Sequence, residues 1–266
     1  MNAIQLTPYD LSFAAGLILI LALLSLILNL GLSRQILVAA LRTAIQLVLI
    51  GFVLKLLFAN ANPLWMLLIS LVMLLVAGRE VIARQKIKLA GWRGFGIGTV
   101  SMFISSFSVT LFALFVVIGN QPWYAPQYAI PLLGMLLGNT MNGISLGMDR
   151  LLTTTWQQRS IIEQKLMMGE RGMDAIHEIR SESIRSGMIP IINSMASAGI
   201  VSLPGMMTGQ ILAGSPPMDA VKYQILIMFL IAGGTGFGTI TALWITSKEL
   251  FDDRHRLRIN LLQNRN

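Results

Sequence analysis

The sequence predicts an all-α fold, a polytopic membrane helical bundle of about seven transmembrane helices. Of the 266 residues, 55% are hydrophobic and only 12% are charged, and the mean hydropathy is +0.70. A soluble domain carries about 25% charged residues. Seven apolar stretches are long enough to cross a bilayer, and the basic residues gather between alternate stretches. We therefore expect one transmembrane domain over residues 1–266, multi-pass in the cell inner (plasma) membrane.

The expected spans, in chain order, are 11–30, 39–58, 64–81, 95–118, 129–148, 188–213 and 223–246. No Lys or Arg precedes Arg34, so the first stretch lacks the basic start of a signal peptide, and we expect it to be retained. The sixth span contains Pro204, which should kink it, and a re-entrant segment at this point is the alternative. Pairs of glycines four residues apart favour close helix packing. They lie at 94/98, 134/138, 143/147, 205/209 and 234/238.

The basic residues orient the bundle. With seven spans, the segments 31–42, 79–93, 149–187 and 247–266 fall on one side, and they hold 18 of the 20 Lys and Arg residues. The positive-inside rule places these segments in the cytoplasm, which puts the N-terminus outside and the C-terminus inside. Because the net charge of +8 is explained in this way, no nucleic acid partner is expected beside the lipid bilayer.

The segment 149–187, between spans 5 and 6, is as charged as a soluble helix. Ser160 followed by Glu163 is a capping box, so a helix should begin at Ser160. Gly169 can adopt a left-handed conformation and should end that helix after about two turns. A second helical pattern follows, with its apolar side chains at Met173, Ile176, Ile179 and Ile184. A short helix, a glycine break and a second helix are typical of a docking element.

The sequence lacks two common motifs of catalytic sites. The phosphate loop and H-E-x-x-H are absent, and there is no cysteine. His177 and His255 lie in charged segments, where we expect solvated side chains. The chain is therefore not expected to be an enzyme or to bind a cofactor itself. No carboxylate lies in the middle of a span, which disfavours an ion-coupled secondary transporter but leaves it open as an alternative.

Several residues within spans 5 and 6 are candidates for a permeation path. The candidates are Asn139, Asn142, Asn193, Pro204, Met206 and Met207. Amides in a bilayer face either a partner helix or a cavity, and both interpretations remain open here. Methionine thioethers suit soft metals, although filling the core is their ordinary use. The metal ligands, if any, are unknown from the sequence.

The chain resembles the FetB-type permeases of ABC transporters, which include bacterial iron-export permeases and plant relatives linked to aluminium tolerance. The spacing of Glu163, Gly169 and Ile179 is similar to the cytoplasmic EAA loop of ABC permeases, although Gln164 replaces the usual alanine and no Leu-Pro follows Ile179. Further resemblance lies in 42–47, 51–55, 131–139, 163–166, the Ser-Leu-Pro-Gly-Met-Met run at 202–207, and 220–224. It covers about 39–251.

The resemblance implies a permease half that forms a homodimer and pairs with a separate ATP-binding subunit in a 2+2 complex. That partner would use ATP and Mg²⁺. The coupling residues would be Ile162, Glu163, Lys165, Leu166 and Gly169, with Ile162 and Leu166 as an apolar knob and Glu163 and Lys165 as a charged flank. Family members imply export of iron or a related metal species as the cargo. An ABC permease for a non-metal organic solute remains the other possibility.

Overall fold

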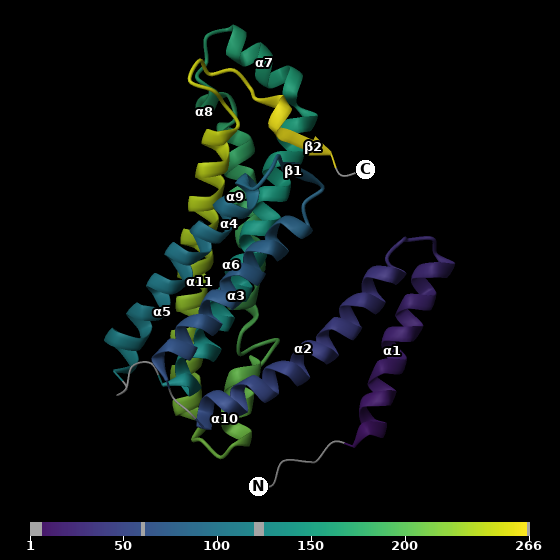
Figure 1. The fold of residues 1–266 in the computed structure, drawn as a ribbon, viewed down its shortest axis with the longest axis vertical. Coiled ribbons are helices and arrows are strands. Elements are labelled where there is room, and N and C mark those ends of the chain that lie inside the picture. Colours follow the sequence, from purple (N-terminus) through teal and green to yellow (C-terminus); the bar gives the residue numbers. More distant parts are fainter. Residues whose placement is uncertain (1–6, 60–61, 120–124, 265–266) are drawn as a thin grey trace. The chain divides into compact units, whose positions relative to one another are not determined.

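The computed structural model describes residues 7–59, 62–119 and 125–264, and it is almost wholly helical (Figure 1). The chain forms two compact units. Unit 1 comprises Met1–Asn62 with Leu212–Gly214, and unit 2 comprises Pro63–Ile211 with Ser215–Asn266. A single permease domain over the whole chain stays a prediction. Arg265 of the predicted basic tail lies outside the described residues.

Unit 1 contains two helices, α1 (Pro8–Ile27) and α2 (Ser33–Ala59), joined by a tight turn. A capping box starts α1, because the backbone N–H of Thr7 donates to Asp10 and the Asp10 N–H donates to the Thr7 hydroxyl. Asn29 and Gly31 have positive φ and reverse the chain. Most apolar side chains of both helices are exposed, as a lipid-facing helix requires.

Unit 2 contains nine α-helices, three shorter helical segments and two short strands among the residues described. They are α3 (Pro63–Ala83), β1 (Ile87–Leu89), α4 (Arg93–Met102), the π-helical η1 (Phe103–Phe107), α5 (Ser108–Phe112), the π-helical η2 (Ala113–Ile118), α6 (Pro126–Gln157), α7 (Arg159–Met167), α8 (Gly172–Ala175), α9 (His177–Ser197), α10 (Gly205–Leu212), α11 (Pro217–Glu249), the 3₁₀ turn η3 (Ile259–Leu261) and β2 (Leu262–Asn264). The segments from α4 to η2 follow one another without interruption.

Six helices of the described chain are long and apolar enough to cross a membrane. They are Tyr9–Ile27, Ser33–Phe58, Pro63–Ala83, Arg93–Val117, Pro126–Gln157 and Pro217–Glu249. They match six of the seven predicted spans and confirm a multi-pass helical membrane protein. Which end of the bundle is cytoplasmic stays a prediction.

The remaining predicted span, 188–213, is divided in two. Helix α9 ends at Ser197, an irregular segment follows, and α10 begins at Gly205. Gly199, with φ of 81°, turns the chain inside this break. The expected kink at Pro204 is wrong, because Pro204 precedes α10 and interrupts no helix. Its carbonyl instead accepts the Thr208 N–H at 3.1 Å and starts the helix.

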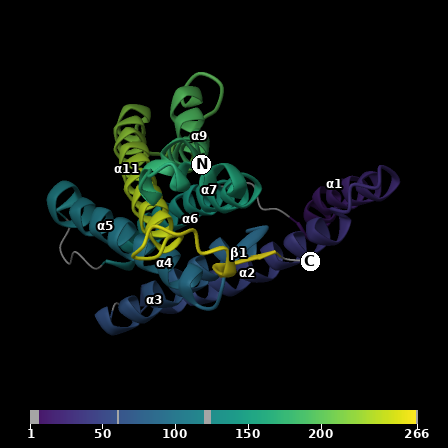
Figure 2. The ribbon, with the colours of Figure 1, turned by 90° about the horizontal axis from the view of Figure 1, so that it is seen from above.

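Helix α6 is the centre of unit 2 and packs against α3, α9 and α11 (Figure 2). The predicted glycine contacts occur here. A Cβ at Gly187 of α9 would lie 2.6 Å from the Gly143 carbonyl oxygen of α6, so the two backbones touch. A Cβ at Gly147 would lie 2.9 Å from the Leu243 side chain of α11. Gly205 and Gly209 face open space, so that predicted pair makes no such contact, and of the pair 134/138 only Gly134 has a close neighbour.

Candidate functional site

The candidate coupling segment lies at one end of unit 2, where α6 ends and α7 and α8 lead into α9 (Figure 1). The predicted start of its helix is wrong by one residue. Helix α7 begins at Arg159 after Gln158, and the Ser160 side chain makes no capping bond. The physical reason is that α6 and α7 are separated by Gln158 alone. The Gln158 N–H still bonds to Thr154 of α6 while its carbonyl accepts from Ile162 of α7, leaving no room for a separate cap.

The end of α7 follows the prediction. Gly169 has φ of 94°, in the left-handed region that other residues rarely adopt. The Gly169 N–H bonds to the Leu166 carbonyl, and the Glu170 N–H bonds to the Lys165 carbonyl at 3.2 Å. These bonds satisfy carbonyls that the helix end would otherwise leave open. Lys165, half-buried in the last turn, lies where a cation complements the helix dipole.

The apolar side chains of α7 divide between two faces. Ile162 is only 1% exposed and belongs to the core of unit 2, and Leu166 packs against the same core. These two residues, predicted to form the apolar knob, therefore do not face a partner. They pack on the core of unit 2 and anchor α7 to it. Met168 is 76% exposed, and Ile161 and Met167 are also exposed. Glu163 lies exposed on the same short helix.

The C-terminal tail and the basic loop after α3 support this end of the bundle. Phe251, which follows α11, covers Gly172 of α8 so closely that a Cβ there would lie 2.5 Å from its ring. Strand β2 pairs antiparallel with β1. The Lys86 N–H donates to Asp149 at 2.8 Å. Three segments that the charge pattern predicts on one side of the membrane are thus gathered at one end. The short sheet was not predicted, and no pattern in the tail indicates it.

An ion-pair group joins the same segments. A carboxylate oxygen of Glu249, at the end of α11, lies 3.2 Å from Arg93 at the start of α4 and 3.9 Å from Arg258 in the tail. All three side chains are partly exposed, so each pair contributes about 1 kcal/mol or less. Their main effect is to fix the position of the tail against α4 and α11.

The three candidate asparagines do not meet at one point. The Asn139 amide donates to the Met135 carbonyl of its own helix at 2.8 Å. The Asn142 amide oxygen accepts from the Arg84 guanidinium at 3.2 Å, beyond the end of α3. Asn193 is exposed on α9. The structure thus gives two of them ordinary protein partners, and their role in a path stays a prediction.

The break between α9 and α10 borders a cavity of about 540 Å³. Its lining includes Pro204 and Met207 of the predicted path, together with Met195, Gln224 and Met228. Met206 lines a separate cavity of about 180 Å³, so the adjacent methionines face different spaces.

Sequence reasoning missed Gln224 of α11. Its side chain is buried, and its amide oxygen has no hydrogen-bond partner within the described part of the chain. Buried amides normally have partners, and this acceptor lies on a residue that lines the larger cavity. Its position at the start of the last span resembled an ordinary polar residue near a membrane boundary, and only the packing distinguishes it.

The described residues contain no group of three or more His, Cys, Asp or Glu side chains that could hold a metal ion. Among the residues that line the larger cavity, the side chains with oxygen or sulfur donors are Gln224 and Met195, Met207 and Met228. His177 and His255 are exposed, as expected.

Comparison with known proteins places this architecture in a family. Residues 8–251 match the family described as "Uncharacterised protein family (UPF0014)". The UPF0014 membrane protein slr1647 of Synechocystis sp. is 40% identical over 87% of this chain and 88% of its own. The probable iron export permease protein FetB of Escherichia coli is 31% identical over 99% of both chains. Protein ALUMINUM SENSITIVE 3 of Arabidopsis thaliana is 30% identical over 93% of this chain and 89% of its own.

No solved structure matches the chain. The family match extends from the first helix to the end of α11, and it includes the broken segment and α7. Its relatives include a bacterial protein named as a probable iron export permease and a plant protein of the kind that the sequence resemblance indicated. The chain belongs to the UPF0014 family of membrane proteins.

Proposed function

We propose that this chain is the permease subunit of an ABC transporter, and that α7 docks on a separate ATP-binding subunit that supplies ATP hydrolysis with Mg²⁺. The observation that carries the proposal is the two-sided character of α7. Its inner face is anchored by Ile162, whereas its outer face exposes Ile161, Met167 and Met168 beside Glu163. A rigid short helix with an exposed apolar and charged surface suits a partner's cleft better than it suits water.

Movement of α7 would reach the membrane through a short route. Gly169 provides the turn after α7, α8 follows at Gly172, and α9 begins at His177. Helix α9 packs against α6 and α11 and ends at the break that borders the larger cavity. In this proposal the backbone turn at Gly169 transmits the position of α7 to α9. Lys165 and Leu166 hold the last turn of α7 in place.

For the cargo we propose iron or a related metal species, on the basis of the name of the Escherichia coli relative. The larger cavity is the candidate place for a transported metal, because Met195, Met207 and Met228 line it together with Gln224. Thioethers select soft metals, so this lining suits a related soft metal species better than iron itself. A homodimer within a 2+2 complex would enclose one path between two such subunits.

The docking proposal is tested by Met168→Arg in a preparation that contains both subunits. A charge on the exposed face should lower the yield of complex by about tenfold, the effect of about 1.4 kcal/mol. Met218→Arg is the matched control, since Met218 is 67% exposed at the start of α11, and the α7 end of unit 2 lies at the other end of that helix. Equal yields for the two variants would contradict docking through α7. Leu166→Arg is less informative, because Leu166 packs on the core and its loss disturbs folding.

Reconstitution of both subunits in vesicles tests the energy source and the cargo together. Movement of Fe²⁺ should require ATP and should stop with an ATP-binding subunit that cannot hydrolyse it. Movement that continues without nucleotide and collapses with an ion gradient would instead identify a secondary transporter. Other metals and candidate organic solutes, offered in the same assay, decide the cargo.

A further inference from the structure

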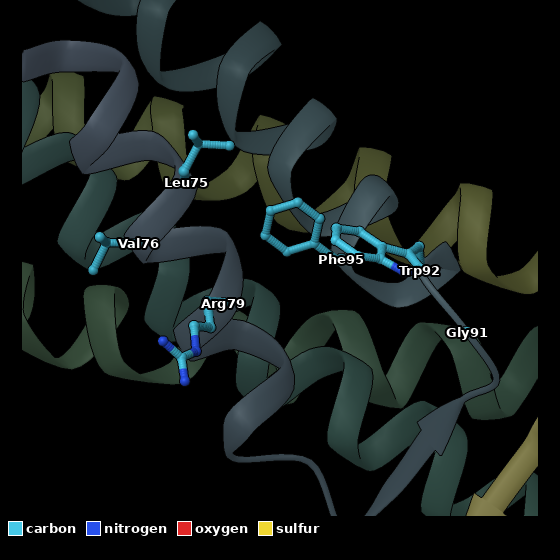
Figure 3. Close-up of a pocket in the computed structure, with 6 residues that line it drawn as sticks. All are labelled: Leu75, Val76, Arg79, Gly91, Trp92 and Phe95. Atoms are coloured by element: carbon cyan, nitrogen blue, oxygen red, sulfur yellow. The ribbon is translucent and has the colours of Figure 1, made fainter. Parts of the chain in front are cut away.

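A groove of about 620 Å³ lies between the end of α3 and the start of α4, away from the residues used above. Figure 3 shows its lining, with Leu75, Val76 and Arg79 on α3, Gly91 in the preceding turn, and Trp92 and Phe95 at the start of α4. The proposed coupling and path residues do not contribute to it. It therefore requires an explanation of its own.

The walls of the groove are fixed by close helix packing. Gly78 of α3 lies directly against Thr99 of α4, and a Cβ at Gly98 would lie 3.4 Å from Val81. The rings of Trp92 and Phe95 meet edge to face, with centroids 5.8 Å apart. Because glycines let side chains of each helix pack closely on the other, the groove is present before any ligand binds.

One end of the groove is cationic and the other is apolar. Arg79 is exposed and has no hydrogen-bond or ion-pair partner among the residues described. Arg93 is different, because Glu249 neutralises it at 3.2 Å. Trp92 is 82% exposed, and its indole N–H likewise has no acceptor in the described part of the chain. The groove thus presents a guanidinium and an N–H donor without protein partners in the described chain, together with the apolar side chains of Leu75 and Val76 (Figure 3).

The groove lies where a membrane helix meets water. Arg79 is near the end of the candidate span Pro63–Ala83, and Trp92 immediately precedes the span Arg93–Val117. Tryptophan is enriched at this depth, where its ring is apolar and its N–H reaches polar groups. The positive-inside rule assigns this end to the cytoplasm, whose leaflet carries anionic lipids.

We propose that the groove binds one anionic phospholipid. The Arg79 guanidinium donates to two phosphate oxygens, a geometry that its planar fork matches. The indole N–H of Trp92 donates to a phosphate or ester oxygen, and an acyl chain covers Leu75, Val76 and Phe95. A lipid fits better than a protein partner because the apolar floor belongs to a membrane span while the unneutralised cation faces the boundary. This site is independent of the ATP-driven transport proposed above.

The first test measures lipid selectivity by native mass spectrometry of the purified protein. Phosphatidylglycerol and phosphatidylcholine with identical acyl chains are offered in equal amounts. The wild type should retain phosphatidylglycerol preferentially, and Arg79→Gln should lower that preference about fivefold. Arg150→Gln is the matched control, since Arg150 is also exposed and has no partner in the described ranges, but it lies on α6 outside the groove. An unchanged preference in Arg79→Gln, or an equal loss in Arg150→Gln, would overturn the proposal.

A second measurement uses the wild type and so does not depend on the folding of Arg79→Gln. Phosphatidylglycerol brominated on its acyl chains should quench tryptophan fluorescence more than brominated phosphatidylcholine, and Trp92→Phe should remove most of that difference. Equal quenching by the two brominated lipids would contradict the proposed lipid site. This result is expected if a second copy of the chain covers the groove. Displacement by soluble glycerol phosphate as effective as displacement by the lipid would identify a free phosphate site instead.

Discussion

The two ends of α9 use apolar side chains in opposite ways. Where α9 begins, Ile176 is fully buried, and Leu250 and Phe251 of the tail enclose the same core. Where α9 ends, Ile200 and Val201 are almost fully exposed beside an open cavity. The two ends of α9 therefore differ in how tightly they are packed. The end that would receive force from a partner is rigid, and the end that would contact the cargo has space to rearrange.

The largest expected effect is on the rigid end, through Phe251→Ala. Phe251 is buried against Gly172, so its removal should lower the free energy of unfolding by about 3–5 kcal/mol. Thermal unfolding in detergent measures the change. Phe237→Ala is the control, because Phe237 is exposed on α11 and should change the unfolding temperature little. Similar losses in both variants would show that the α7 end is no more tightly packed than the lipid-facing surface.

A smaller effect is expected where α9 crosses α6. Gly187→Ala places a methyl group 2.6 Å from the Gly143 carbonyl oxygen, and the overpacking should cost about 1–3 kcal/mol. Gly138→Ala, on α6 with nothing within 4 Å, should be neutral or slightly stabilising because alanine favours helix. Unfolding of the two variants, compared with wild type, measures the difference. Equal stability would show that the backbones can separate without cost.

Much of the membrane architecture could be predicted from the sequence because apolar length and charge placement are local properties. Six of the spans and the left-handed Gly169 follow from such signals. The position of the break within 188–213 could not be predicted, because Pro204 is compatible with both a kink and a helix start. Burial of Ile162 depends on which face of α7 meets the core of unit 2, and the partnerless oxygen of Gln224 depends on packing. Tertiary contacts decide both.

At the end of α9 beside the larger cavity, replacing Met206 and Met207 together by leucine should preserve the fold. The volumes are similar, so we expect a change in unfolding free energy of less than about 1.5 kcal/mol. Transport of the metal should fall if thioethers contact it, and Met207→Leu alone should cause most of the loss because only Met207 lines the larger cavity. Met102→Leu, at a buried site outside both cavities, is the control. Unaltered transport in the double variant would remove both residues from the path.

The smallest effect concerns how the tail is held at the rigid end. The backbone N–H of Arg256 donates to Asp252 at 2.8 Å and is the main reason that the pKa of this carboxyl lies below its usual range. Because the pKa of Asp252 is lowered on folding, its carboxylate stabilises the folded protein at pH values above the unfolded-state pKa of about 3.9. This stabilisation is lost as the pH falls through the pKa of Asp252 in the folded protein. Asp252→Asn should therefore speed hydrogen exchange of the Arg256 amide at pH 7.

The same comparison at low pH separates charge from shape. Once the wild-type carboxyl is protonated, Asp252→Asn and the wild type should exchange at similar rates, because neither then offers a carboxylate to the Arg256 N–H. Asp253→Asn is the neighbouring control, since Asp253 is exposed and accepts no hydrogen bond among the residues described, and it should change exchange at neither pH. A difference between Asp252→Asn and wild type that persists unchanged at low pH would mean that the side-chain shape, and not its charge, secures the tail.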